Sequence, residues 1–127
     1  MYKGFILSES LEDPTFLNLL RHEYVQVQRR NDDPSLGYPP FWHAFKVLVD
    51  DEEIEAVAQE TAHLLKKQGW YAHYWNGEVC IVCFPGKIMH MPQEQRGTWS
   101  SPQYQAVREY ALRSGITERY LDFLIEP

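Results

Sequence analysis

The sequence predicts an α+β domain with a mostly antiparallel sheet. Three adjacent segments carry this prediction: an aromatic strand at 41–49, an amphipathic helix after Asp50, and a hairpin at 70–84 that turns at Asn76-Gly77. Strands joined by tight turns pair antiparallel, whereas parallel pairs need long crossovers. Asn-Gly is a strong hairpin signal because a type I′ turn needs positive φ at both central residues. We therefore expect one antiparallel sheet that packs against helices.

The elements before this unit follow from local turn and cap signals. Residues 3–8 (KGFILS) predict a short buried strand, and the Asp-Pro pair at 13–14 predicts the start of a short helix. Asp can accept bonds from free helical N–H groups, and Pro suits the first helical position. Residues 22–30 alternate as a strand with one wet face does. Val25 and Val27 lie on one side of it, and Tyr24, Gln26 and Gln28 on the other.

The later elements are bounded by similar signals. Asp50 with Glu53 forms a capping-box pattern at the start of the central helix, and Gly69 is placed to close it in a left-handed conformation. KIMHM at 87–91 predicts a third, edge strand after the hairpin. Ser-Pro at 101–102 begins a last helix, and the apolar tail at 121–125 is expected to dock on the sheet.

The order strand, short helix, strand, strand, helix, strand is that of a ferredoxin-like βαββαβ sandwich. The sequence adds one or two strands and a C-terminal helix to it. With 127 residues and neither an internal repeat nor a linker, the chain is expected to form a single domain over 1–127. Helices on one face are expected; the alternative is an α+β arrangement in which the C-terminal helix covers the second face.

The composition excludes several classes of function. The net charge of −6 opposes binding to nucleic acid or to acidic membranes, because contacts with phosphate need a basic surface. There is no long apolar segment and no signal-like N-terminus. Two cysteines do not make a disulfide framework. We therefore expect a reduced cytoplasmic protein that binds neither nucleic acid nor membrane.

The hairpin predicts which side chains share a face. With a two-residue turn at Asn76-Gly77, His73 lies opposite Cys80, and side chains alternate between faces. One face then carries Trp70, Ala72, Tyr74, Val79, Ile81 and Cys83. The other carries Tyr71, His73, Trp75, Glu78, Cys80, Val82 and Phe84. The second set holds the ionisable groups, so we expect it to form the open or partner-covered face.

This register gives one set of candidate catalytic residues. An imidazole at His73 directly opposite Cys80 could lower the thiol pKa, and Glu78 could orient the ring. The alternative is that Cys80 is a small buried apolar residue. Cys80 and Cys83 spell a CxxC motif, but positions three apart in a strand point to opposite faces, so we do not expect them to chelate metal or to form a disulfide.

No metal or cofactor is expected. The five histidines have no repeated spacing, and His43 on an otherwise apolar stripe is expected to be a hydrogen-bonded core residue. Phosphate-loop, dinucleotide and zinc-protease motifs are absent. An aromatic sheet could stack RNA bases, but the RNA-recognition pattern is missing and the charge is acidic.

Three segments resemble a set of small uncharacterised prokaryotic proteins. They are GFILSESLEDPTFLNLL near the N-terminus, GWYAHYWNGEVCIVCF in the centre and TWSSPQYQAVREYALRSGITERYLDF near the C-terminus. Together they cover well over half of the chain. The resemblance implies a compact stand-alone cytoplasmic domain, and it implies no activity, cofactor or catalytic residue.

Three functions follow as hypotheses. The first is a self-associating binding module, a homodimer or a ligand-binding protein, that uses the aromatic face through Trp42, Tyr71, His73 and Trp75. The second is a small-molecule enzyme that uses His73, Cys80 and Glu78 on that face, with the loop at 31–40 as a lid. The third is a regulatory partner that accepts a strand at the 87–91 edge.

Overall fold

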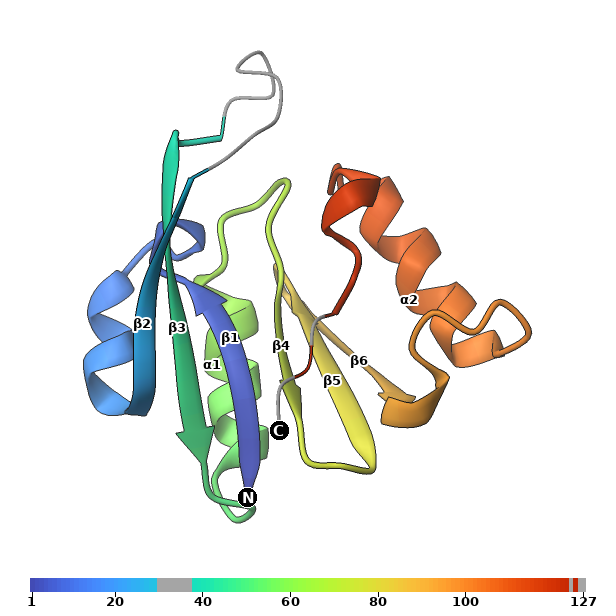
Figure 1. Ribbon diagram of the computed structural model, residues 1–127, viewed down its shortest axis with the longest axis horizontal. Coiled ribbons are helices and arrows are strands. Elements are labelled where there is room, and N and C mark those ends of the chain that lie inside the picture. The colour runs from blue at the N-terminus through green and yellow to red at the C-terminus, as the bar shows by residue number, and fades with distance from the viewer. Residues whose placement is uncertain (30–37, 124, 126–127) are drawn as a thin grey trace.

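The computed structural model describes residues 1–29, 38–123 and 125. Its strands are β1 (Tyr2–Leu7), β2 (Arg21–Arg29), β3 (Phe41–Val49), β4 (Ala72–Trp75), β5 (Val79–Phe84) and β6 (Lys87–Pro92). Its α-helices are α1 (Ile54–Leu64) and α2 (Pro102–Arg113), and short 3-10 helices include Pro14–Leu19 and Glu118–Tyr120. Figure 1 shows these elements around one sheet.

The six strands form a single antiparallel sheet in the order β2-β3-β1-β4-β5-β6. The predicted α+β class is therefore confirmed. The specific ferredoxin-like sandwich is not confirmed, since the order of this six-stranded sheet differs from it and helices cover both of its faces.

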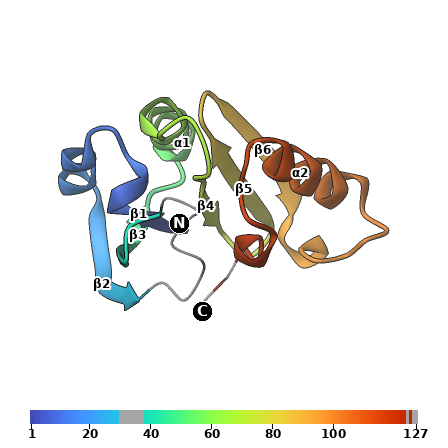
Figure 2. The same cartoon turned by 90° about the horizontal axis from the view of Figure 1, so that it is seen from above.

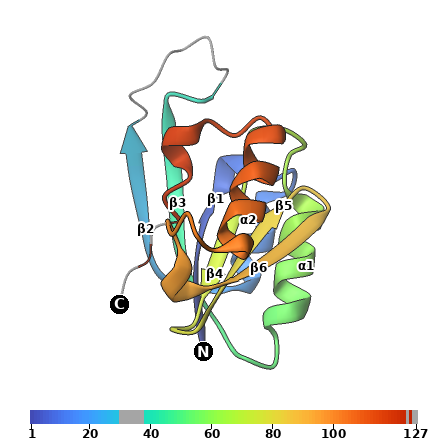
Figure 3. The same cartoon turned by 90° about the vertical axis from the view of Figure 1, so that its right-hand side faces the viewer.

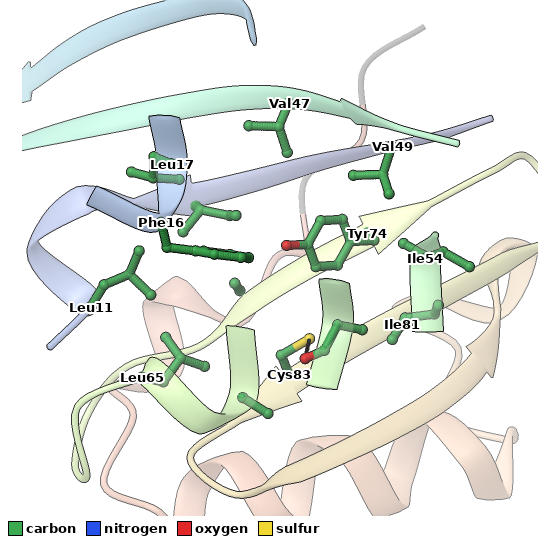
Figure 4. Close-up of a cluster of buried hydrophobic side chains, with 14 residues drawn as sticks. Leu11, Phe16, Leu17, Val47, Val49, Ile54, Leu65, Tyr74, Ile81 and Cys83 are labelled. Carbon is green, nitrogen blue, oxygen red and sulfur yellow. Dashed lines mark hydrogen bonds between the residues drawn. The ribbon is translucent and has the colours of Figure 1, made fainter. Parts of the chain in front are cut away.

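One face of the sheet, here called the α1 face, packs against α1 and the 3-10 helix Pro14–Leu19. Its core takes Ile6 from β1, Val47 from β3, Tyr74 from β4 and Ile81 from β5, all almost fully buried. Figure 4 shows the Tyr74 ring among these side chains. The Tyr74 hydroxyl lies 2.7 Å from the Thr61 hydroxyl of α1, so the buried polar group is satisfied.

The opposite face, here called the α2 face, carries a second core over β5 and β6. Cys80, Val82 and Phe84 of β5 pack there against Val107 of α2 and Phe123 of the C-terminal segment. Figures 2 and 3 show α1 and the red C-terminal segment on opposite sides of the central strands. The predicted docking of the apolar tail is thus confirmed for Leu121 and Phe123, which are buried.

Two of the predicted caps form and two do not. The Asp13 side chain accepts a bond from Thr15 N at 3.0 Å, and the Ser101 side chain accepts one from Tyr104 N at 3.2 Å. The capping box at Asp50 and Glu53 is wrong: α1 begins at Ile54, after a turn, and Glu53 makes no side-chain cap bond. Gly69 has the predicted left-handed conformation, with a φ of 82°, but it does not close α1, which ends at Leu64 with Leu65 as its C-cap.

The predicted hairpin register is also wrong, by two residues. Trp75 pairs with Cys80, and His73 pairs with Val82 rather than Cys80. The Asn76 side chain accepts bonds from the backbone N–H groups of Glu78 and Val79 at 2.9 and 2.8 Å, and this local turn widens the connection. Because the shift is even, the predicted assignment of side chains to faces is unchanged.

The aromatic face is not open at β4 and β5. His73, Trp75 and Phe84 are buried, because α2 and the C-terminal segment fold over this half of the α2 face. This is the alternative arrangement, in which the C-terminal helix covers the second face. Among the described residues, this cover does not extend over the other half of the sheet, toward β2, and a cavity lies there.

Candidate functional site

A cavity of about 370 Å³ lies on the α2 face of the sheet, between β2 and the C-terminal segment. We call it the sheet cavity. Strands β1, β2, β3 and β4 supply its floor, and the segment after α2 supplies the opposite wall. The floor residues are Phe5, Leu7, Tyr24, Gln26, Gln28, Trp42, Ala44 and His73, and the wall includes Ile116, Arg119, Tyr120 and Asp122.

Four aromatic rings form one end of the sheet cavity. Tyr38 contacts Trp42, Trp70 and Tyr120, with ring centroids 5.8, 5.1 and 5.9 Å apart and nearly perpendicular planes. Trp42 also lies 5.0 Å from Tyr120, centroid to centroid. Edge-to-face contacts of this kind hold large rings in fixed orientations. This end is therefore a rigid apolar wall built from four separate parts of the chain.

Trp42 brings an unsatisfied polar group to this wall. Its side chain is buried, and its Nε1–H finds no acceptor among the residues that the structure describes. A buried donor without a partner costs about 1–3 kcal/mol. An acceptor atom on a bound molecule that reached this donor would remove that cost.

His73 is the residue of β4 that lines the floor. It is buried and stacks on Trp75, with ring centroids 5.2 Å apart and an interplanar angle of 27°. Phe5 of the neighbouring strand β1 lies 6.0 Å from the His73 ring and 5.2 Å from the Trp75 ring, again centroid to centroid. Trp75 does not line the cavity; it supports His73 from the side.

The C-terminal wall is fixed by two anchors. The Tyr71 hydroxyl donates a hydrogen bond to the Tyr120 carbonyl, and Phe123 is fully buried with its ring centroid 5.4 Å from that of Tyr71. Phe123 has a φ of 45°, a left-handed conformation that a bulky residue rarely adopts. Arg96 Nη1 donates to the Phe123 carbonyl at 3.2 Å. Burial, reinforced by the nearby charge of Asp122, raises the pKa of Tyr71, so its phenol stays neutral.

Charged groups at the sheet cavity are more often positive than negative. Among the described lining residues, Arg29 and Arg119 are cationic and Asp122 is the only carboxylate. The two guanidinium groups lie over neighbouring rings: Arg29 is 5.3 Å from the Phe41 centroid, and Arg119 is 5.4 Å from the Tyr120 centroid. These cation–π contacts place permanent positive charge beside an apolar hollow.

Lys46 is a buried cation on β3, on the same face of the strand as Trp42 and Ala44. It is 97% buried and pairs with Glu23 of β2 at 3.0 Å, and its Nζ lies 5.7 Å from the centroid of the Tyr24 ring. A buried ammonium needs such a carboxylate because its desolvation is costly. Lys46 is therefore part of the structure beside the sheet cavity and is not among its lining residues.

The structure brings three of the predicted binding residues to one site. Trp42, Tyr71 and His73 all line the sheet cavity, whereas Trp75 lies beside it. The proposed lid at 31–40 lies mostly outside the described residues, which resume at Tyr38. His43, expected in the core, is instead half-exposed near the start of β3, where its backbone N–H and its Nδ1 bond the Glu9 carboxylate at 2.7 and 2.6 Å.

The candidate catalytic residues do not converge. Cys80 is opposite Trp75 rather than His73, and Glu78 is exposed in the hairpin connection. Burial raises the pKa of the Cys80 thiol to about 12, against a smaller lowering effect of Arg96. This is the opposite of what a nucleophilic thiolate needs. Cys80 and Cys83 are free thiols in the cores of opposite faces, as the alternation of the strand predicts.

The sequence analysis did not identify several residues that line the sheet cavity. Trp70 precedes β4, where strand alternation no longer decides its direction, and Tyr38 follows a Pro- and Gly-rich loop. Tyr120 and Arg119 lie in a 3-10 turn that follows α2, far beyond β4 in the chain. The only available signal was their aromatic and cationic character, which many exposed residues share.

Comparison of the chain with protein-family models, with curated proteins and with solved structures finds no match in any of the three. Within the described residues, no helix is both long and apolar enough to cross a membrane. In the same part of the chain, no three His, Cys, Asp or Glu side chains come together as they would to hold a metal ion.

Proposed function

We propose that this protein binds a flat organic molecule in the sheet cavity, with an anionic or other acceptor group on that molecule. The observation that carries the proposal is the buried Trp42 Nε1–H, which has no acceptor among the described residues and belongs to a side chain of the cavity wall. The volume of about 370 Å³ is within the usual range for small-ligand sites.

The lining favours a particular ligand chemistry. The edge-to-face rings of Tyr38, Trp42 and Trp70 suit a planar apolar body, which can stack on one ring and meet the edge of another. Two guanidinium groups against one carboxylate favour an anion over a cation. An aromatic carboxylate combines both properties.

The test is a binding titration with one- and two-ring aromatic carboxylates, among them 2-naphthoate. Trp42 and Trp70 are intrinsic fluorescent reporters of the site, and ligand-observed NMR gives a second readout. The decisive variant is Ala44→Leu, because Ala44 is a buried floor residue whose enlargement fills the sheet cavity. The matched control is Ala106→Leu, the same change at an exposed position of α2.

We expect the wild-type protein and Ala106→Leu to bind with the same affinity and Ala44→Leu to lose binding. Equal binding by Ala44→Leu would place the ligand elsewhere and contradict the proposal. Failure of every carboxylate to bind the wild-type protein at millimolar concentration would contradict it as well.

A further inference from the structure

We propose that two copies of this chain pair through β2, antiparallel and with Gln26 facing Gln26 of the second copy, to form one continuous sheet. The proposal is independent of ligand binding in the sheet cavity. It differs from the dimer expected from the sequence, because the aromatic face that would have formed that interface is buried within the chain.

The first argument is the exposure of the β2 edge. β2 ends the sheet (Figure 1). Every residue from Arg21 to Arg29 is exposed except the half-buried Tyr24. Its outer N–H and C=O groups are a template for another strand. Val25 and Val27 are 48% and 63% exposed, and Phe41 of β3, on the same side of the sheet, is 46% exposed.

The second argument is that, within the described residues, β2 has little of the usual protection of an edge. Proteins blunt edge strands with Lys, Pro, short length, bulges or a covering helix. β6, at the other end of the sheet, has only six residues, begins at Lys87, ends at Pro92 and packs beside α2. β2 has nine residues with neither Lys nor Pro, and its one irregularity lies near its start, between His22 and Tyr24.

The third argument identifies the occupant as a second copy. When Gln26 faces Gln26 of the second copy, Val25 faces Val27 and Tyr24 faces Gln28, each pair occurring twice. Apolar residues then meet apolar residues, and polar residues meet polar ones. Moving the centre by one residue to Val25 would instead bring Val27 to the irregularity at Glu23 at both ends. Directly opposed pairs interact most strongly, so polarity favours the register centred on Gln26.

This pairing would also bring two sheet cavities together. Gln26 and Gln28 line the cavity on the α2 face, and directly opposed residues of an antiparallel pair point to the same side. The Gln26 and Gln28 side chains of the second copy would therefore extend the cavity floor beyond β2. Val25 and Val27 point to the other side, so they can be changed without altering the cavity lining.

The test uses charges at these two valines. Sedimentation velocity on the full-length protein should show a concentration-dependent dimer. Val27→Lys and Val25→Glu should each weaken it at least about tenfold, because each single change opposes a charge to a valine twice in the interface. Leu112→Lys, the same kind of change at an exposed position of α2, is the matched control and should remain dimeric.

The register centred on Gln26 is tested by mixing the two variants. An equimolar mixture of Val25→Glu and Val27→Lys should re-form a dimer, because Glu at position 25 of one copy then faces Lys at position 27 of the other. Circular dichroism of each variant checks that the monomer is folded. A wild-type monomer at high concentration, or a dimer that both single variants leave intact, would overturn the proposal. Failure of the mixture to dimerise would overturn the register centred on Gln26.

Discussion

The ring of Tyr74 fills the space that a side chain at position 4 would need: a β-carbon on Gly4 would lie 2.7 Å from Cε1 of Tyr74. The two residues are paired across β1 and β4, in the middle of the sheet. Gly4→Ala should therefore destabilise the protein by about 1–3 kcal/mol, as overpacking of a core does. Urea unfolding measures this free energy.

A double-mutant cycle separates that clash from the intrinsic preferences of glycine and alanine. In a Tyr74→Leu background the obstructing ring is gone, so Gly4→Ala should cost much less than in the wild-type protein. The same cost in both backgrounds would show that the Tyr74 ring is not responsible.

Alkaline pH should reveal the burial of Cys80. Burial raises its pKa to about 12 from an ordinary value of 9.0, so the folded protein holds this proton to higher pH than the unfolded chain does. The contribution of this pKa shift to the free energy of unfolding is fully present below pH 9. It is lost as the pH rises toward 12, by about 1.4 kcal/mol per pH unit. Unfolding of Cys80→Ala should show a shallower decline between about pH 9 and pH 10 than the wild-type protein. Equal slopes would contradict this assignment.

Acid should weaken the contact between Glu9 and His43. Partial burial opposes the effect, but hydrogen bonds from the backbone and ring of His43 hold the pKa of Glu9 below its ordinary value of 4.5. A depressed carboxyl pKa stabilises the fold above the unfolded value, and this stabilisation is lost as the pH falls through the folded value.

Glu9→Gln should therefore lower stability at pH 7 and make little difference near pH 3, as measured by urea unfolding at both pH values. Glu60→Gln, an exposed change on α1, is the control and should have no such pH-dependent effect. A deficit in Glu9→Gln that is as large near pH 3 as at pH 7 would argue against the carboxylate as its source.

Trp42→Phe should separate acceptor recognition from apolar stacking. The substitution removes the unsatisfied Nε1–H and keeps an aromatic ring in the cavity wall. Affinity for 2-naphthoate should fall about tenfold or more, within the range expected for loss of a hydrogen bond to a charged group. Affinity for naphthalene, which has no acceptor, should change little. Trp99→Phe, at an exposed position outside the cavity, is the control for the loss of one indole. An equal loss for both ligands would assign Trp42 a packing role alone.

The sequence predicted the local parts of this structure better than their assembly. The caps at Asp13 and Ser101 and the opposite directions of Cys80 and Cys83 depend on near neighbours, and all are confirmed. The strand at β2 forms, but the prediction that only one of its faces is wet is wrong, because Val25 and Val27 are exposed as well. The predicted hairpin register was wrong because the Asn76 side chain accepts hydrogen bonds from two backbone N–H groups. The spacing of apolar residues does not reveal these bonds.

The site required information that no local pattern holds. The sequence predicted an open α2 face because the residues that cover it, Phe123 and its neighbours, lie far along the chain from the strands they bury. Apolarity predicted that the tail would dock somewhere on the sheet. It could not predict that Tyr120 and Gln26 would line one cavity between the C-terminal segment and β2.

The alternation of β5 between two cores has a consequence for the dynamics of the sheet. Ile81 and Cys83 are held in one core, and Cys80, Val82 and Phe84 in the other. Amide hydrogens of β5 can exchange with solvent only when packing on both sides is lost, so they should be the slowest in the sheet. Those of β2, where the side chains are mostly exposed, should be among the fastest in a monomer. Protection should thus rise across the sheet from β2 to β5, and the sheet cavity lies on the side that opens first.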